Sequence, residues 1–419
     1  MRMHLPRSVR VTALAAAILA AAPRAGALTP QPHLTPVVLF PAFHFTKLRV
    51  TVAHQAVAPE CPRSGAFSDW FLNDTTSDFS QACQDKLLTL AYRSGPLPMR
   101  LRFSEQPGVR VDFIDYGKTS SAPFYEPLYA FLEANGYQRD VNIRVAGYDS
   151  RLSPDMGLFV ERTRLLVEAT YRENGMTPVH LVGHSNGPIY AQYFLTHVPR
   201  EWKDKFIHGF TPIAGNLPGQ GLSYLLFFTG LDITYFTFPA DPESARASAA
   251  MYQSLPSSYV MAAAPAVFGD REVVLTSRAS GRSYTPLDFD QLFADAGRPV
   301  AREIAAHYIG FLEFTDPAHY PDVDVFAEKG SGLPTAVGAE IDDLTTGQLL
   351  GESTVLLLRA GDANQEDLTN DAVQAWRGMR CFHFELNDNP GVDHFNLPSN
   401  EAVLARLLAH LRRPRSRCP

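Results

Sequence analysis

At residues 179–187 the chain reads VHLVGHSNG, which is a short apolar run followed by a G-x-S-x-G pattern. The apolar run predicts a buried strand, and from Ile189 onward apolar side chains recur at helical spacing. Glycine stands on both sides of the serine because a Cβ in so sharp a turn would collide with neighbouring backbone. The stretch therefore predicts a strand, a tight turn and a helix, with Ser185 presented as a nucleophile at the carboxyl edge of a sheet.

Strands alternate with helices around this stretch, which predicts an α/β fold with a mostly parallel sheet covered by helices on both faces. The expected strands are 36–41, 109–113, 142–147, 179–182, 354–358 and 381–386, and the expected helices are 124–135, 154–174 and 402–411. Between about 221 and 339 the alternation gives way to aromatic, proline-punctuated sequence. Such a segment favours an insertion that forms a cap or lid over the sheet.

The N-terminus has the pattern of a signal peptide. Three arginines accompany an apolar run from Val11 to Ala22, and the small residues at 25–27 fit a cleavage site. The apolar run is shorter than the roughly 20 residues that a membrane-spanning helix needs. We therefore expect a signal peptide at 1–27, a sheet-and-helix core at 28–220 and 340–419, and the cap at 221–339.

The composition is that of a folded globular protein, since 45% of the 419 residues are apolar and 11% are aromatic. The net charge of −7 removes the electrostatic attraction that drives binding to nucleic acid, so nucleic acid is not an expected partner. Four cysteines in a chain that enters an oxidising compartment favour disulfides, with three full pairings open. We expect Cys61 to pair with Cys83 across a short loop; Cys381 and Cys418 either pair or stay a free core thiol and a loose thiol.

A serine hydroxyl becomes nucleophilic when a base removes its proton and a carboxylate orients that base. On α/β folds with this serine turn, the acid and then the base follow the serine along the chain. Asp362 comes soon after the expected strand 354–358, where the acid belongs; the alternative is a turn-forming aspartate. Of the two later histidines, His383 lies inside an expected strand, whereas His394 lies in a loop before the last helix. We therefore predict a catalytic triad of Ser185, Asp362 and His394.

The attacked carbonyl becomes an oxyanion, and its charge needs fixed N–H donors. The backbone N–H of Asn186 directly follows the nucleophile and supplies one donor, and the loop after the first strand supplies a second at Phe43. The sequence contains no H-E-x-x-H and no paired C-x-x-C pattern, so we expect no metal and no other cofactor. The hydrolytic chemistry is then expected to come from the serine alone.

Several segments resemble the lecithin:cholesterol acyltransferase family, which includes the lysosomal phospholipase that also transfers acyl groups to lipid alcohols. GYDSRLSP at 147–154 looks like the Y-D-W-R-L-x-P segment of that family, and 183–187 looks like its nucleophile motif. Further matches fall in family order along nearly all of the mature chain, at 284–289, 292–295, 332–335, 361–362 and 394–396. The resemblance implies an α/β-hydrolase fold, and it implies the same acid and base, Asp362 and His394.

The resemblance also implies how the chain meets lipid. Cys61 and Cys83 resemble the ends of a disulfide-closed loop, at about 55–90, that engages the lipid surface in this family. Trp70, Phe71 and Leu72 would then form its tip, because an indole beside apolar groups suits an interface. The alternative is that Trp70 packs in the protein core.

The implied activity is that of a phospholipid-dependent O-acyltransferase and phospholipase A, which moves a fatty acyl group from a glycerophospholipid to a lipid alcohol, a sterol or similar, or to water. The implied partners are a phospholipid membrane or lipoprotein surface, bound peripherally, and the lipid alcohol acceptor. The expected location is outside the cell or in an endomembrane, lysosomal or vacuolar lumen.

Two alternatives stay open. A soluble carboxylesterase for non-lipid esters would share the triad but would not need the disulfide-closed loop. A catalytically weak lipid-binding relative would keep the fold and lose the oxyanion hole. The second alternative arises because the first-strand loop, PAFHF at 41–45, replaces the P-G and small polar residues that are usual in the family.

Overall fold

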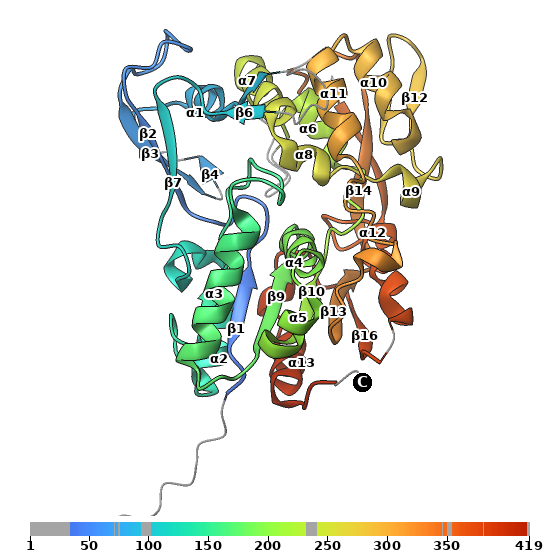
Figure 1. Ribbon diagram of the computed structural model, residues 1–419. Helices are drawn as coiled ribbons and strands as arrows, with labels where there is room; N and C mark the ends of the chain where they lie inside the picture. Colours follow the sequence, from blue (N-terminus) through green and yellow to red (C-terminus); the bar gives the residue numbers. More distant parts are fainter. Residues whose placement is uncertain are drawn as a thin grey trace, which may run out of the picture. The chain divides into compact units, whose positions relative to one another are not determined.

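The computed structural model describes residues 34–70, 72–73, 76–93, 102–231, 241–345, 347–349, 354–379 and 381–416 (Figure 1). Residues Leu34–Pro419 form one compact unit. The expected signal peptide, Phe71 and Cys418 lie outside the described residues. Within the described ranges, no helix has both the length and the apolar character required to cross a membrane.

The largest sheet has six strands, and every neighbouring pair in it is parallel. Its spatial order is β16 (Phe384–Pro390), β13 (Val325–Ser331), β10 (Ile207–Ile213), β9 (Val179–His184), β1 (Val37–Phe40) and β8 (Ile143–Val145). Successive side chains of a strand point to opposite faces. In β1, Val38 and Phe40 join one apolar core while Val37 and Leu39 join another. The sheet therefore has a core on each face.

Helices cover both faces of this sheet, which confirms the predicted α/β architecture (Figure 1). One core includes α3 (Phe159–Glu173), α4 (Gly187–Thr196) and α5 (Arg200–Phe206), and the other includes α2 (Glu126–Ala134) and α13 (Glu401–Arg412). The helix expected at 154–174 begins later than predicted, at Phe159. Leu158 causes the delay because its φ of +58° lies in the left-handed region, which an α-helix does not adopt.

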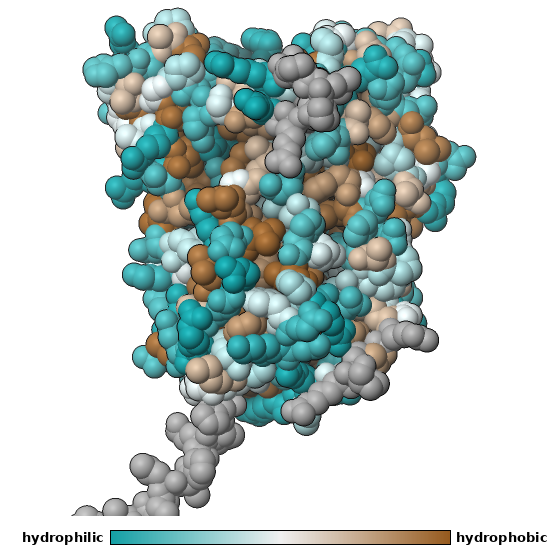
Figure 2. Space-filling model, viewed as in Figure 1, coloured by the Kyte–Doolittle hydropathy of each residue, from teal (hydrophilic) through white to brown (hydrophobic). Residues whose placement is uncertain are grey.

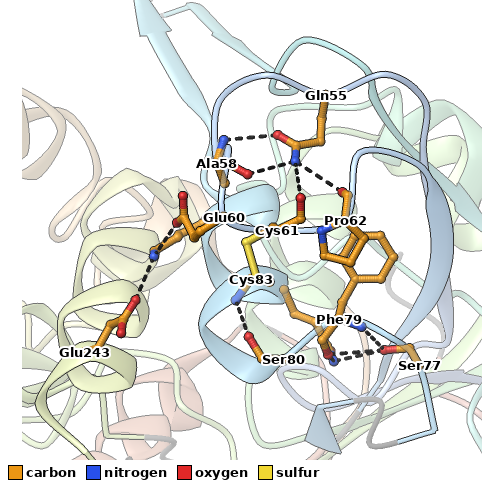
Figure 3. Close-up of a disulfide and its surroundings, with 12 residues drawn as sticks. Gln55, Ala58, Glu60, Cys61, Pro62, Ser77, Phe79, Ser80, Cys83 and Glu243 are labelled. Atoms are coloured by element: carbon orange, nitrogen blue, oxygen red, sulfur yellow. Dashed lines mark hydrogen bonds and ion pairs between the residues drawn. A yellow bond between two sulfur atoms is a disulfide. The ribbon is translucent and has the colours of Figure 1, made fainter.

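A second sheet is antiparallel, in the order β4 (Leu72–Asn73), β3 (Gly65–Trp70), β2 (Leu48–Val52) and β7 (Val109–Phe113). The strand expected at 109–113 therefore forms, but outside the parallel sheet. A separate hairpin pairs β5 (Ala91–Arg93) with β6 (Arg102–Ser104). The predicted disulfide joins Cys61 to Cys83 of α1 (Gln81–Leu88) (Figure 3). Cys381 is also disulfide-bonded, so it is not a free core thiol.

The third sheet, which we call the cap sheet, has the order β12 (Arg282–Tyr284), β11 (Leu275–Ser277), β14 (Leu333–Ile341) and β15 (Thr354–Gly361). The helices of the same region are α6 (Ser223–Thr229), α7 (Pro242–Ser254), α8 (Pro256–Val260), α9 (Pro265–Phe268), α10 (Phe289–Asp295) and α11 (Pro299–Tyr308). One strand of the expected insertion, β13, pairs in the six-stranded sheet instead. The chain thus returns to the parallel sheet before the boundary at 339 that the sequence suggests.

β15 corrects a second expectation. The strand predicted at 354–358 exists, but it pairs antiparallel with β14 in the cap sheet and has no partner in the parallel sheet. An apolar run shows that a segment suits a strand, but it does not show which sheet will contain it. The remaining short elements are α12 (Asp367–Asp371), η1 (Thr119–Ser121), η2 (Pro123–Tyr125), η3 (Pro286–Asp288), η4 (Pro317–His319), η5 (Ala372–Gly378) and η6 (Leu397–Ser399).

Candidate active site

Ser185 lies in the turn between β9 and α4, as predicted. Its φ of +60° is a strained conformation for a residue with a side chain, and such strain concentrates at functional sites. A Cβ on Gly183 would lie 2.8 Å from the backbone nitrogen of Pro188. A Cβ on Gly187 would lie 2.1 Å from the carbonyl oxygen of Phe40. The turn therefore requires glycine at both flanking positions, and it holds the serine at the carboxyl end of β9.

Two backbone hydrogen bonds join the serine turn to the end of β10. The N–H of Ser185 donates to the carbonyl oxygen of Ile213 at 3.0 Å, and the N–H of Asn216 donates to the carbonyl oxygen of Ser185 at 2.8 Å. Asn186 is the N-cap residue of α4, at the helix end where peptide N–H groups have no partner within the helix. Its position suits an oxyanion donor, and that role stays a prediction.

Asp362 and His394 form a buried pair. Nδ1 of His394 lies 3.0 Å from Oδ2 of Asp362, and the two side chains are 1% and 0% exposed. The N–H of His394 also donates to the carbonyl oxygen of Asp362 at 2.8 Å. The other carboxylate oxygen, Oδ1, accepts from the N–H groups of Asn364 at 3.0 Å and Gln365 at 2.6 Å. The carboxylate is thus oriented from both sides, and it fixes the imidazole.

The remaining ring nitrogen of His394, Nε2, is buried and has no hydrogen-bond partner within the described part of the chain. Because Nδ1 donates its proton to a carboxylate, a neutral imidazole carries the lone pair on Nε2. A lone pair in this position is what a general base needs.

The acid reaches the sheet edge by an unexpected route. A Cβ on Gly330, in β13, would lie 2.9 Å from the Cβ of Asp362, so Asp362 sits beside the end of β13. Its own strand, however, is β15 of the cap sheet, which ends at Gly361. His394 follows β16, the neighbour of β13 in the parallel sheet. Asp362 therefore pairs with His394 although the strand before it belongs to the cap sheet, and its role as the acid stays a prediction.

Ser185 and His394 line one small cavity. Its other lining residues include the first-strand loop and part of the cap region: Ala42, Phe43, Phe45, Asn216, Gln220, Met261, Asn364 and Phe395. The cavity measures about 10 Å³, which is room for one water molecule at most. Phe43, the predicted second oxyanion donor, therefore lies beside the serine in a closed site, and its role stays a prediction.

The other histidine considered from the sequence lies elsewhere. His383 precedes β16, and its Nε2 lies 3.3 Å from a carboxylate oxygen of Glu385. His383 does not line the cavity of Ser185, which agrees with the choice of His394 over His383.

A group with metal-ligand spacing lies away from this cavity. Glu313, Asp316 and His319 place one ligand atom each within 4.8 Å of one another. Both carboxylates are exposed, and exposed acidic groups often approach each other without an ion. None of the three residues lines the cavity of Ser185.

A buried carboxyl pair that the sequence does not predict lies close to Asp362. Glu366 follows Asp362 in the same loop, and its Oε1 accepts from the N–H of Gly221 at 2.9 Å. Burial, together with the nearby Glu272, raises the pKa of Glu366 to about 8. Burial also raises the pKa of Glu272. Only the folded chain brings these two carboxyl groups together, because they are far apart in the sequence.

The predicted lipid-contact tip falls at the turn between β3 and β4. Trp70 ends β3 and pairs with Leu72, which begins β4. Phe71, between them, lies outside the described residues. Contact of these residues with lipid stays a prediction.

Comparison with known proteins supports the resemblance. The lecithin:cholesterol acyltransferase family matches residues 103–283. The lysosomal phospholipase A and acyltransferase of Bos taurus is 28% identical over 303 residues, which are 71% of this chain and 69% of that protein. The phosphatidylcholine-sterol acyltransferase of Rattus norvegicus is 28% identical over 325 residues, which are 74% of this chain and 69% of that protein.

Among solved structures, a chain of the Tle4–Tli4 complex aligns with a TM-score of 0.59. It is 11% identical and covers 92% of this chain and 100% of its own length, so it bears on the fold alone. Together with the parallel sheet and the serine turn, these matches show an α/β-hydrolase fold and an enzyme of the acyltransferase and lipase class, similar to the lecithin:cholesterol acyltransferase family.

Proposed function

We propose that the protein is a phospholipid-dependent O-acyltransferase and phospholipase A that works through Ser185, Asp362 and His394. Oγ of Ser185 attacks the ester carbonyl of a glycerophospholipid while Nε2 of His394 takes the hydroxyl proton. The N–H groups of Asn186 and Phe43 stabilise the oxyanion. His394 then protonates the departing alcohol, and a lysophospholipid leaves the acyl-enzyme.

In the second half of the cycle, a lipid alcohol or water attacks the acyl-enzyme. His394 removes the proton of the acceptor, the acyl group moves to the acceptor oxygen, and Ser185 is regenerated. Which acceptor prevails depends on the shape of the open pocket. Sterols and similar lipid alcohols are the acceptors that the family relationship favours.

The observation that carries this proposal is the hydrogen bond of 3.0 Å between His394 and Asp362, beside a cavity that Ser185 and His394 share. A structural serine turn has no need of a buried imidazole whose second nitrogen is left without a partner. The relatives, which are a phospholipase and acyltransferase and a sterol acyltransferase, support phospholipid as the acyl donor.

The proposed setting follows from the remaining features. The disulfide-closed loop, with Trp70, Phe71 and Leu72 at its tip, would dock peripherally on a membrane or lipoprotein surface. A signal peptide at 1–27 would deliver the chain to the cell exterior or to an endomembrane, lysosomal or vacuolar lumen, where the Cys61–Cys83 disulfide is stable. The name of the Bos taurus relative, a lysosomal phospholipase A and acyltransferase, supports a lumenal site of action.

Two measurements test the proposal. A fluorophosphonate reagent should label the wild-type protein on Ser185 and should not label Ser185→Ala. Phosphatidylcholine vesicles that contain a sterol or ceramide should then yield lysophospholipid, and acylated acceptor should form besides free fatty acid. Free fatty acid as the only acyl product would restrict the activity to hydrolysis. A folded protein that does not label at Ser185 would refute the proposal and favour a lipid-binding relative.

The carboxylesterase alternative has its own test. Replacing 62–82 with a short linker, together with Cys61→Ala and Cys83→Ala, removes the disulfide-closed loop. Our proposal expects this variant to lose activity on vesicles and to keep labelling at Ser185. Unchanged activity on vesicles would instead favour a soluble esterase.

A further inference from the structure

A chain of hydrogen bonds runs beneath the reaction centre and joins three separate loops. The N–H of Ala42 donates to the hydroxyl oxygen of Tyr125 at 2.8 Å. That hydroxyl lies 3.0 Å from Nδ1 of His184. Nε2 of His184 lies 3.0 Å from the carbonyl oxygen of His394. The chain thus begins next to Phe43, passes beside the serine turn, and ends on the backbone of the predicted base.

The direction of every bond in this chain is determined by its two ends. An amide N–H can only donate, so the oxygen of Tyr125 accepts at the first bond. A carbonyl oxygen can only accept, so the proton of the His184 ring is on Nε2. The neutral ring then has its lone pair on Nδ1 and accepts the hydroxyl proton of Tyr125. All three bonds therefore polarise in one direction, which strengthens each of them.

Both side chains are held in the form that this arrangement needs. Tyr125 is 1% exposed and His184 is fully buried. Burial, with a smaller contribution from His394, holds the pKa of His184 well below its usual value, so the ring stays neutral. The ring of Phe124 lies parallel to the ring of His184, with 6.2 Å between the ring centroids.

The position of these residues in the fold explains what the chain can do. Ala42, His184 and His394 lie at the ends of three different strands or in the loops that follow them, and Tyr125 ends η2, at the start of α2. Neither Tyr125 nor His184 lines the cavity of Ser185. Their side chains instead tie together the backbone of the oxyanion loop, the serine turn and the base loop.

We propose that Tyr125 and His184 are positioning residues that hold the oxyanion donor, the nucleophile and the base at the spacing that catalysis requires. The inference rests on the proposed function. Loss of the chain should misplace the reacting groups by a fraction of an ångström and slow the chemical step, because rate depends steeply on such placement. Binding of the substrate away from the reacting groups should be preserved.

The test is Tyr125→Phe, which removes the hydroxyl and keeps the ring. With a soluble short-chain ester as substrate, we expect kcat to fall about 10- to 100-fold while KM changes by less than about twofold. The rate of fluorophosphonate labelling at Ser185 should fall in parallel with kcat. Tyr129→Phe is the matched control, since Tyr129 lies one helical turn further on, is also fully buried, and donates its hydroxyl to the carbonyl oxygen of Ala122 at 3.0 Å.

His184 provides a second variant pair. His184→Gln keeps an N–H donor that can reach the carbonyl oxygen of His394, whereas His184→Ala keeps none. We expect His184→Gln to retain more activity than His184→Ala. The double variant Tyr125→Phe/His184→Gln should lose less than the product of the two single losses, because both residues act in one chain.

Equal kcat in Tyr125→Phe and Tyr129→Phe would overturn the inference. This holds if kcat and the unfolding temperature fall in both variants, and it also holds if kcat is unchanged in both. A wild-type protein that is active, beside a Tyr125→Phe variant that is equally active, would therefore refute the inference alone. Failure of the wild-type protein itself to label at Ser185 would refute the proposed function and the inference with it.

Discussion

Asp362 is held through both of its carboxylate oxygens. Oδ2 contacts Nδ1 of His394, and Oδ1 is held by two backbone N–H groups of the same loop. This arrangement leaves the carboxylate no freedom to rotate, so the imidazole keeps one orientation and one tautomer. A substitution of Asp362 that keeps its shape can therefore test the effect of its charge on activity without a large effect on folding.

We expect Asp362→Asn to lower kcat by about 10⁴-fold with little effect on folding, because the amide would favour the wrong tautomer of His394. Steady-state kinetics with a soluble ester, together with the unfolding temperature, would measure both effects. Asp367→Asn is the control, since Asp367 begins α12 and does not line the cavity. Retention of more than a tenth of the activity in Asp362→Asn would remove this residue from the proposed mechanism.

At the scale of single residues, the sequence predicted the site where the pattern is local. Ser185 was predictable because the strand, the two glycines and the helix are contiguous. The sequence favours His394 over His383, because His394 lies in a loop and His383 lies inside an expected strand. Tyr125 and His184 were not predictable as partners, since 59 residues separate them and only the folded sheet brings them together.

At the scale of elements, the disulfide-closed loop is fastened to the cap helix α7. The hydroxyl of Ser248, in α7, donates to the buried carboxylate of Asp85, in α1, at 2.5 Å. On the exposed side of the same contact, Nζ of Lys86 lies between the carboxylates of Glu60 and Glu243, at 2.6 and 3.1 Å (Figure 3). The disulfide-closed loop and the cap are thus joined by one buried contact and one exposed contact.

The buried contact and the exposed contact should contribute differently to the free energy of unfolding. Ser248→Ala removes a hydrogen bond from the buried carboxyl group of Asp85, and we expect it to lower the free energy of unfolding by about 1–3 kcal/mol. Lys86→Ala should cost much less, because solvent and salt screen an exposed ion pair. Urea unfolding of both variants would measure the difference. A larger loss in Lys86→Ala than in Ser248→Ala would contradict the expectation.

The loop that carries Asp362 contains a carboxyl group that folds in its neutral form. The pKa of Glu366 rises from 4.5 in the unfolded chain to about 8 in the folded one. The stabilisation that comes from its protonated form is therefore complete below about pH 4.5 and is lost as pH rises towards 8.

Glu366→Gln should reproduce the neutral form at every pH. We expect the variant to gain stability relative to the wild type as pH rises from 5 to 8, while the two proteins converge near pH 4.5. Unfolding temperatures measured across this range would show the trend. Glu243→Gln, on the exposed side of α7, is the control and should show no such gain. A constant difference between wild type and Glu366→Gln at all pH values would refute the assignment.

Sheet membership is where prediction from the sequence reached its limit. β9 and α4 were predictable, because local periodicity and the glycines determine them. β15 was predictable as a strand but not as a member of the cap sheet, and β13 was hidden inside a segment without clear periodicity. Pairing between strands is decided by contacts distant in the sequence, which a local pattern does not contain.

At the scale of the whole molecule, the buried histidines and the buried carboxyl pair have opposite effects on how the free energy of unfolding changes with pH. Burial lowers the pKa of His180, His184 and His208, and it lowers the pKa of His410 to about 4. A lowered histidine pKa means that the unfolded chain binds the proton first, so stability falls as pH drops below about 6.5. The carboxyl pair of Glu272 and Glu366 has the opposite effect on the alkaline side.

Four histidines outnumber two carboxyl groups, so the histidines should dominate below pH 6.5 and the carboxyl pair should dominate from there to about pH 8. We expect the free energy of unfolding to pass through a maximum near pH 6.5. Chemical unfolding at intervals between pH 5 and pH 9 would locate it. Figure 2 shows many hydrophilic residues on the visible face, and their surface charges should respond more weakly because solvent screens them. Stability that does not decline between pH 6.5 and pH 5 would contradict this balance.

The attachment of Asp362 to β15 limits how the enzyme can open. If the cap moved as one rigid body that included the cap sheet, the carboxylate of Asp362 would move away from the imidazole of His394 each time a lipid entered. The proton relay would then have to reassemble in every turnover. We therefore expect substrate to enter by movement of side chains and of the short helices around the cavity. The cap sheet would keep its position, and Asp362 would stay hydrogen-bonded to His394.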